Sequence, residues 1–473
     1  MELKDKHCIV IGLGDTGLSA AKWLARQGAR VTVADSRDAP PNLDAIRAVM
    51  PQPELRLGVF SAATFADADL LVVSPGVALA TPEIAAALAR GVPAVGDVEL
   101  LAQAIAGKGC KVIAITGANG KSTVTTMVGA MCQAAGLQTE IAGNIGLPVL
   151  DALTNWQEKS GQEKNALPDV WVLELSSFQL ETTSSLQPDS AAVLNVTEDH
   201  LDRYPGGMKQ YAAAKARIFA GSGVQVLNRE DAWCRHMALA GREIVWFGAD
   251  APQNENDYGL VAAGNDFSLC MGGTELMKAS ELPLAGLHNA VNALSALALC
   301  RAIGLELPPL LAALKSFKGL PHRVEFVAQV NGVDYFDDSK GTNVGATEAA
   351  LKGMTCPVIL IAGGDGKGQD FRPLKSACER ICRAVILIGR DGPQIAEVLN
   401  EATSAYLTPG DEEENFLPVL QVPTLEMAVQ MAANFAEPGD AVLLSPACAS
   451  WDMFRNYAHR AEVFIDSVKA LQP

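Results

Sequence analysis

The octapeptide TGANGKST at residues 116–123 sets the architecture of the middle of this chain. It follows the apolar run KVIAI (111–115) and opens the helix-forming stretch KSTVTTMVGAMCQAAG (121–136). A strand, a glycine-rich turn and a helix N-terminus in this order form a phosphate cradle, because backbone N–H groups and the helix dipole face the phosphate oxygens. Lys121 is placed to reach the terminal phosphates, and Ser122 to hold Mg²⁺. The pattern predicts ATP binding.

The loop departs from the general P-loop pattern G-x-x-x-x-G-K-[ST] at one position. Ile115 stands where that pattern has its first glycine, so the loop is a shorter variant. An ordinary glycine turn before a helix is the alternative interpretation. The apolar strand before the loop and the helix after it favour the cradle.

Composition and charge limit the class of protein. A chain of 473 residues with 49% hydrophobic and 19% charged residues is long enough for two or three domains with large cores. A net charge of −17 argues against nucleic acid as the main partner, because a phosphate backbone needs a basic face. The sequence shows neither a leader nor an apolar run that would span a bilayer, and its ten cysteines form no CxxC pair. We expect a cytoplasmic protein without membrane insertion.

The first 98 residues alternate strand and helix patterns and carry a dinucleotide-type fingerprint. Gly12-x-Gly14-x-x-Gly17 follows the first strand, and Asp35 ends the second strand, 18 residues after Gly17. A dinucleotide needs two mononucleotide-binding halves, which so short a segment does not supply. A single nucleotide diphosphate fits better, with its pyrophosphate at the glycine turn and the rest near Ser36 and Arg37. A plain Rossmann turn without ligand is the alternative.

The same alternation continues to the C-terminus and divides the chain into three. We predict an α/β fold with a Rossmann-like domain at 1–98, a central P-loop domain with a parallel sheet at 99–318, and a second Rossmann-like domain at 319–473. The polar stretches 154–168 and 249–258 and the acidic run 410–415 are expected to be surface loops.

Ionisable residues follow two apolar strands downstream of the P-loop. The strand in VWVLELSSFQLE (170–181) ends at Glu174, and a second strand runs into Glu198, Asp199, His200 and Asp202. A carboxylate at the carboxyl end of a strand beside a P-loop strand is well placed to hold Mg²⁺. Taken alone, Glu174 could instead face water and His200 could be an ordinary loop histidine.

Eight motifs now stand in a characteristic order along the chain. They are TGANGKST, AGNIG (142–146), ELSSFQLE (174–181), NVTEDHLDRY (195–204), GLHNAVNAL (286–294), GLPHRVE (319–325), DDSKGTN (337–343) and SPACASWDMF (445–454). This order resembles that of the Mur ligases, ATP-dependent amide ligases of peptidoglycan precursor synthesis, over essentially the whole chain. The likeness is greatest to members that add D-glutamate to UDP-N-acetylmuramoyl-L-alanine. It implies turnover of ATP to ADP and phosphate through an acyl phosphate, with closure of the third domain bringing Arg323 and Lys340 to the site.

The resemblance also implies roles for residues at the matching positions. Catalytic roles fall to Lys121, Glu174, His200, Lys215 and Arg323. ATP would be bound by Thr116, Gly117, Ala118, Asn119, Gly120, Lys121, Ser122, Thr123, Asn289, Asn292, Arg323, Asp338 and Lys340. The UDP-sugar would contact Thr16, Asp35, Ser36, Arg37, Gly76, Asn144, Gln179 and His200. Glutamate would be bound by Thr342, Lys367, Ser450 at the apparent start of a helix, Trp451 and Tyr457. Two Mg²⁺ ions would be held by Ser122, Glu174, His200 and Lys215, the last as a carbamate.

Three positions depart from the family's usual pattern. Asp15 stands where a leucine is common beside the uridine, Trp451 replaces a leucine, and Tyr457 replaces a phenylalanine. The last two changes leave the choice between D- and L-glutamate open. Another Mur ligase, a folylpolyglutamate synthase, an NAD-dependent dehydrogenase and an ATPase-type binding module remain as alternatives. We expect a monomer.

Overall fold

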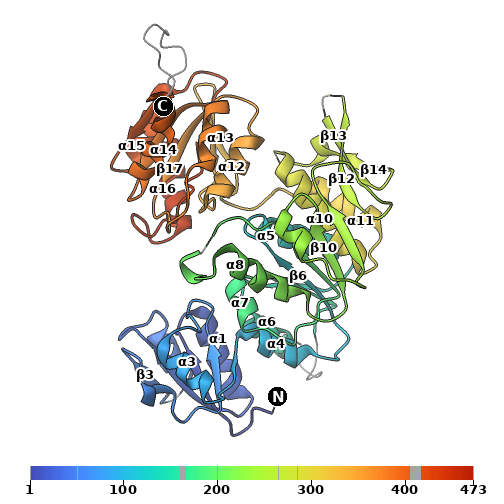
Figure 1. Cartoon of the computed structure of the whole chain (residues 1–473), viewed down its shortest axis with the longest axis vertical. Coiled ribbons are helices and arrows are strands. Elements are labelled where there is room, and N and C mark those ends of the chain that lie inside the picture. The colour runs from blue at the N-terminus through green and yellow to red at the C-terminus, as the bar shows by residue number, and fades with distance from the viewer. Residues whose placement is uncertain are drawn as a thin grey trace.

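The computed structural model describes residues 2–50, 52–159, 167–199, 201–264, 266–284, 286–404 and 417–471. Three domains follow one another along the chain, each built on its own sheet. In Figure 1 the first domain (blue) and the third (orange to red) lie at opposite ends of the molecule, and the central domain (green to yellow) connects them. His200 and the acidic run 410–415 lie outside the described residues.

The first domain is a five-stranded parallel sheet of order β3-β2-β1-β4-β5. Its inner strands are apolar and buried along nearly their whole length, as expected for parallel strands covered on both faces. Its strands are β1 (His7–Ile11), β2 (Arg30–Asp35), β3 (Glu54–Leu57), β4 (Leu70–Val73) and β5 (Ala94–Val95), and its helices are α1 (Asp15–Arg26), α2 (Leu43–Val49) and α3 (Pro82–Ala89).

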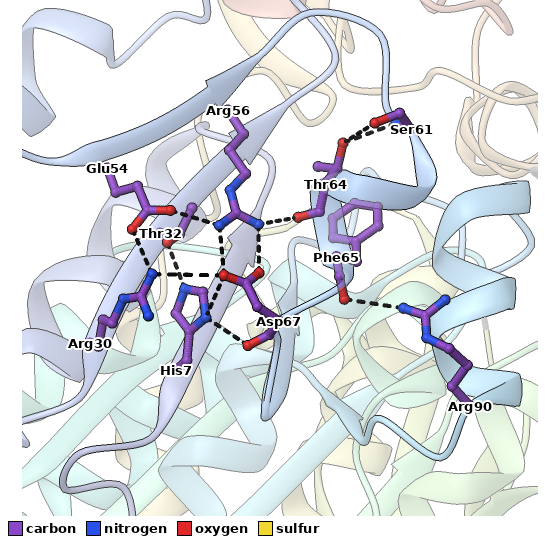
Figure 2. Close-up of polar contacts among 10 residues, drawn as sticks. All are labelled: His7, Arg30, Thr32, Glu54, Arg56, Ser61, Thr64, Phe65, Asp67 and Arg90. Atoms are coloured by element: carbon purple, nitrogen blue, oxygen red, sulfur yellow. Dashed lines mark hydrogen bonds and ion pairs between the residues drawn. The ribbon is translucent and has the colours of Figure 1, made fainter.

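A charged network closes the amino-terminal edge of this sheet, opposite the glycine turn (Figure 2). Arg56 donates to both carboxylate oxygens of Asp67, at 2.9 and 3.0 Å, and to Glu54 at 2.7 Å. The hydrogen bonds from Arg56 lower the pKa of Asp67 to about 2. His7, at the start of β1, contacts the hydroxyl of Thr32 at 2.7 Å. Opposite charges at this edge are therefore paired within the domain.

The central domain is a nine-stranded sheet of order β14-β13-β12-β11-β10-β9-β6-β8-β7. Its strands are β6 (Lys111–Thr116), β7 (Thr139–Gly143), β8 (Val170–Glu174), β9 (Ser190–Val193), β10 (Val224–Asn228), β11 (Ile244–Phe247), β12 (Tyr258–Ala263), β13 (Asp266–Met271) and β14 (Thr274–Lys278). Its helices are α4 (Asp97–Ile105), α5 (Lys121–Ala134), α6 (Val149–Lys159), α7 (Ser177–Glu181), α8 (Gly207–Ala216), α9 (Ala232–His236), α10 (Leu287–Ala302) and α11 (Leu307–Ser316). The P-loop helix α5 packs against α10 and α11 in one hydrophobic core. No helix among the described residues is long and apolar enough to cross a bilayer.

One prediction about this domain is wrong in detail. The polar stretch 154–168 is not all loop, because α6 continues to Lys159. Leu150 and Leu153 lie in the core and Trp156 packs against it, so the polar residues of this stretch form the outer face of an amphipathic helix. The predicted parallel sheet is confirmed from β7 to β12, and β12, β13 and β14 add an antiparallel meander at one edge.

The third domain is a six-stranded sheet of order β15-β16-β20-β17-β18-β19, parallel except for the β15–β16 hairpin. Its strands are β15 (Glu325–Val330), β16 (Val333–Asp337), β17 (Val358–Gly363), β18 (Cys382–Ile388), β19 (Val419–Gln421) and β20 (Ala441–Leu444). Its helices are α12 (Val344–Gly353), α13 (Pro373–Ile381), α14 (Gly392–Ser404), α15 (Leu425–Phe435) and α16 (Tyr457–Lys469). We keep domain boundaries near 98 and 318 as a proposal, since both positions fall between sheets.

Candidate active site

The predicted phosphate loop lies between β6 and α5. Gly120 precedes the helix with a φ of +82°, in the left-handed region that favours glycine. A Cβ on Gly120 would lie 2.7 Å from the side-chain oxygen of Asn292 on α10, so a larger residue would displace that side chain. The structure thereby brings the P-loop and Asn292, two parts of the expected ATP site, into contact.

Half-buried Lys121 and buried Lys215 converge on one carbonyl oxygen of this loop. Lys121 Nζ donates to the carbonyl oxygens of Gly117 at 2.9 Å and Ala118 at 2.8 Å, and Lys215 Nζ donates to the same Gly117 oxygen at 2.8 Å. Burial lowers the pKa of Lys121, and burial together with the charge of Lys121 lowers the pKa of Lys215 well below its ordinary value. Two ammonium groups so close together favour an anion between them.

Glu174 ends β8, which pairs directly with the P-loop strand β6. Its side chain is 1% exposed, and Asn144 Nδ2 donates to Oε1 at 2.8 Å. The other oxygen, Oε2, is buried and accepts no hydrogen bond among the described residues. Glu174 ends the strand next to β6, and Ser122 lies just beyond the end of β6. A buried carboxylate oxygen without a donor at this place fits a hard divalent cation such as Mg²⁺.

The third domain already reaches this cradle. Arg323 Nη2 donates to the hydroxyl of Ser122 at 3.1 Å, and Asn343 Nδ2 donates to the side-chain oxygen of Asn119 at 3.0 Å. Arg323 therefore contacts the P-loop in this structure, as expected for an assembled site. Asn343 has no predicted role. It caps α12 by accepting from Ala346 N, and a Thr-Asn pair directly before a helix pattern is the signal that could have drawn attention to it.

Other expected ATP-site residues of the third domain lie in the loop after β16. Asp338 is buried, which raises the pKa of its carboxyl group to about 7, and it accepts a hydrogen bond from Ser445 Oγ at 2.7 Å. Lys340 Nζ lies 3.7 Å from the centroid of the Tyr457 ring. Its charge is near enough to contribute to the lowered pKa of Lys121.

The residues expected to bind glutamate lie in loops of the third domain and, for Tyr457, at the first position of α16. Lys367, with a φ of +52°, forms an ion pair across the domain boundary with Asp199, with Nζ and Oδ1 3.8 Å apart. Trp451 is 70% exposed.

The prediction that Ser450 starts a helix is wrong. Its carbonyl accepts hydrogen bonds from the backbone N–H groups of Met453 and Phe454, which form a single turn that does not continue as a helix. Helix α16 starts at Tyr457, where the side chain of Asn456 provides the cap that Ser450 does not. Thr342 lies two residues beyond Lys340 in the loop after β16.

A cavity of about 620 Å³ opens at the carboxyl end of the first sheet, the edge at which such folds bind nucleotides. It is lined by residues of the first domain and, from the central domain, by the segment after β7 and by α7. All seven described residues of the expected UDP-sugar set line it, namely Thr16, Asp35, Ser36, Arg37, Gly76, Asn144 and Gln179.

Asp35 is a buried residue in the lining of this cavity. It is 2% exposed and accepts hydrogen bonds from Leu13 N at 2.7 Å and from Arg37 N, Nε and Nη2 at 3.0, 2.8 and 2.7 Å. Burial alone would raise its pKa, but the bonds from Arg37 and Leu13 outweigh burial and lower it. Protein donors occupy both oxygens, so the carboxylate of Asp35 fixes the positions of Arg37 and of the glycine turn. Asp15, at the mouth, is exposed and accepts from Asn42 at 3.0 Å.

Comparisons with known proteins agree with this architecture. The chain matches the family models for the Mur ligase MurD-like N-terminal domain at 6–96, the Mur ligase middle domain at 115–300 and the Mur ligase glutamate ligase domain at 322–448.

Similar full-length sequences carry one common name. This chain is 56% identical over 472 residues to the UDP-N-acetylmuramoylalanine--D-glutamate ligase of Methylobacillus flagellatus, and the alignment covers 100% of this chain and 98% of the relative. It is 55% identical over 472 residues to the enzyme of that name from Chromobacterium violaceum, covering 100% and 99%.

Solved structures show the same fold at low identity. A pseudomurein peptide ligase type C from Methanothermus fervidus aligns with a TM-score of 0.60 at 16% identity, covering 99% of this chain and 100% of that one. UDP-N-acetylmuramate-alanine ligase MurC from Thermotoga maritima aligns with a TM-score of 0.59 at 19% identity, covering 98% and 99%. From its cradle, its cavity and these full-length matches, the chain belongs to the Mur ligase family.

Proposed function

We propose that this protein joins D-glutamate to UDP-N-acetylmuramoyl-L-alanine through an amide bond, with conversion of ATP to ADP and phosphate. The observation that carries the proposal is the identity of 50 to 56% over the whole chain to enzymes named for this reaction. The geometry supports it, since the cavity in the first domain could hold a uridine nucleotide, the P-loop could hold a polyphosphate, and the third domain contacts the P-loop.

The first chemical step is phosphoryl transfer. The carboxylate of the terminal L-alanine attacks the γ-phosphorus of ATP in line, the bond to the ADP oxygen breaks, and an acyl phosphate forms. Lys121 holds the β- and γ-phosphate oxygens in place of the Gly117 and Ala118 carbonyls that it contacts here, and Arg323 supplies a second positive charge from the third domain. Asn289, Asn292, Asp338 and Lys340 would hold the rest of the nucleotide.

The second step forms the amide. The neutral amine of glutamate attacks the acyl carbon, the tetrahedral intermediate expels phosphate, and the amine proton is lost to solvent. Thr342, Lys367, Ser450, Trp451 and Tyr457 would hold the amino acid, with Lys367 exchanging Asp199 for a glutamate carboxylate. Contacts between the third domain and the P-loop exclude water that would hydrolyse the acyl phosphate.

Two Mg²⁺ ions would be held by Ser122, Glu174, His200 and a carbamate on Lys215, and when bound they neutralise charge on the transferring phosphoryl group. Lys215 suits carbamate formation, in which its neutral amine adds CO₂ and releases one proton. Its side chain is 1% exposed, and the lowered pKa favours the neutral amine. The carbamate would place oxygen ligands where the buried amine now lies and leave Lys121 as the cation nearest Gly117.

The proposal is tested by phosphate release from ATP in the presence of UDP-N-acetylmuramoyl-L-alanine and single amino acids. Release that requires both the UDP precursor and D-glutamate supports it. Release with L-glutamate instead keeps the mechanism but changes the substrate, with Trp451 and Tyr457 as the residues to exchange next. ATP hydrolysis without any amino acid, or no release at all, would contradict the proposal.

A further inference from the structure

Tyr457 contacts the loop after β16 at two residues, Lys340 and Ser339, and the segment before β15 at His322. Its ring lies under the ammonium group of Lys340, with Nζ 3.7 Å from the ring centroid. Its carbonyl oxygen accepts a hydrogen bond from Ser339 Oγ at 2.8 Å. Its ring also meets the His322 ring edge-on, with the centroids 6.2 Å apart. The first residue of α16 is therefore fastened to the loop that carries the expected ATP-site residues.

The ring face is the partner that the structure provides for the charge of Lys340. No ion pair joins Lys340 to a carboxylate within the described ranges, and the side chain is half-buried. Its backbone N–H donates to the His322 carbonyl at 3.1 Å, so the main chain at this position is also fixed. An aromatic face attracts a partly desolvated cation by its quadrupole.

The position of this pair gives it a role. Lys340 and Arg323 both contribute positive charge near Lys121, and Arg323 is held by the Ser122 hydroxyl. Without Tyr457, repulsion from these two cations would drive the flexible Lys340 side chain toward solvent. With it, the ammonium group stays near the cradle before any phosphate is bound.

We propose that Tyr457 is a positioning residue for Lys340, whose ring holds the ammonium group for the ATP phosphates and so connects the amino-acid pocket with the nucleotide cradle. This rests on the proposed function, in which Tyr457 also borders the incoming glutamate. An amino acid packed against the ring restricts its movement and thereby that of Lys340. Binding of glutamate would then change the affinity for ATP through the side chain of Tyr457.

The test is a double-mutant cycle on the full chain, read out by kcat/KM for ATP and by binding of a non-hydrolysable ATP analogue. Tyr457→Leu removes the ring face and is expected to lower both affinity and kcat/KM for ATP by about 3- to 30-fold. Tyr457→Phe retains the face and should recover most of that loss. Lys340→Met removes the ammonium group, and in that background Tyr457→Leu should cost less than about two-fold.

Independent effects would overturn the proposal. If Tyr457→Leu changes only the KM for glutamate, or lowers ATP binding equally with and without Lys340, the ring does not act through the lysine. Phe454→Leu is the matched control, because it removes a neighbouring ring that contacts His459. It should leave ATP binding unchanged, and a similar loss there would mean that the turn has merely been disturbed. The binding arm needs no glutamate reaction, so it distinguishes failure of this inference from failure of the proposed ligase activity.

Discussion

In the first domain the carboxylates of Asp35 and Asp67 are balanced by partners from the same domain, whereas in the cradle of the central domain positive charges face one another. Asp35 is surrounded by donors from Leu13 and Arg37, and Asp67 by those of Arg56. In the cradle, Lys121 and Lys215 share one carbonyl oxygen, and Glu174 keeps one buried oxygen without a donor.

From this difference we infer that the cavity of the first domain is formed before any ligand binds, whereas the cradle of the central domain is completed by its ligands. Paired charges hold a cavity in shape without a ligand, and they contribute to the stability of the domain. Buried ionisable groups that have only neutral hydrogen-bond partners lower stability, and a bound polyanion and cations would return that free energy as binding. Variants in the cradle should therefore lower activity without lowering stability, and variants of the charge pairs in the first domain should lower stability more than they lower kcat.

The largest effect is expected for Lys121→Ala. Loss of the charge that stabilises the transferring phosphoryl group should lower kcat by about 10²-fold or more. Phosphate release under saturating substrates measures it, with Lys352→Ala as the matched control, because Lys352 is an exposed lysine paired with Glu348 on α12. Near-normal turnover in the Lys121 variant would remove the cradle assignment.

Lys215→Ala should be nearly as damaging, with a loss of about 10²-fold that is partly reversible. The variant lacks the amine that would carry the carbamate, and a short carboxylate such as acetate can enter the space and supply oxygen ligands. We expect added carboxylate to restore part of the activity in this variant and none in Lys121→Ala. A fully active Lys215→Ala enzyme would exclude the carbamate.

Asp35→Asn should raise the KM for the UDP precursor about ten-fold and should change kcat little. An amide can accept from Leu13 but cannot balance the guanidinium of Arg37, so the cavity loses its arrangement while the cradle is untouched. Steady-state kinetics with each substrate varied in turn would measure this. An equal rise in KM for ATP would mean that the two sites are not separable.

Much of this organisation is predictable from the sequence. Local patterns predict the P-loop, the glycine turn and the alternation of strands and helices, because each depends on a few neighbouring residues. The meander β12–β14 was not predicted, since its apolar alternation resembles that of the neighbouring parallel strands. The start of α16 was misplaced because Ser450 is as good a cap as Asn456 when the turn between them is unknown.

Contacts between distant segments escape such reasoning altogether. The hydrogen bond of Asn343 with Asn119 and the stacking of Lys340 on Tyr457 join residues more than a hundred positions apart. Roles for Lys215 and Arg323 came from the resemblance, since neither residue is distinctive in its local sequence.

Lys215→Met should raise stability while abolishing activity. The folded state holds this amine with a pKa well below its ordinary 10.5, so it binds fewer protons than the unfolded chain, and the lysine lowers stability at neutral pH. An apolar side chain of similar length removes this cost, and we expect a gain of about 1–2 kcal/mol in CO₂-free buffer without nucleotide. The gain should shrink as the pH approaches 10.5. Thermal unfolding at pH 7 and 10 would measure it, and a lower Tm at pH 7 would contradict the comparison.

Asp67→Asn should give the smallest effect and the opposite result, a loss of stability without a loss of activity. Asp67 is about half exposed, so solvent screens its pairing with Arg56, and we expect a cost of about 1 kcal/mol at neutral pH. Its pKa in the folded chain is about 2, below the ordinary 3.8, so its contribution is complete above about pH 4 and disappears as the pH falls through 2. Wild type and variant should therefore differ in Tm at pH 7 and converge near pH 2, with equal phosphate release at pH 7. A Tm difference that persists at low pH would show that the network in Figure 2 stabilises the edge of the sheet through packing, and its charges would then not belong to the comparison.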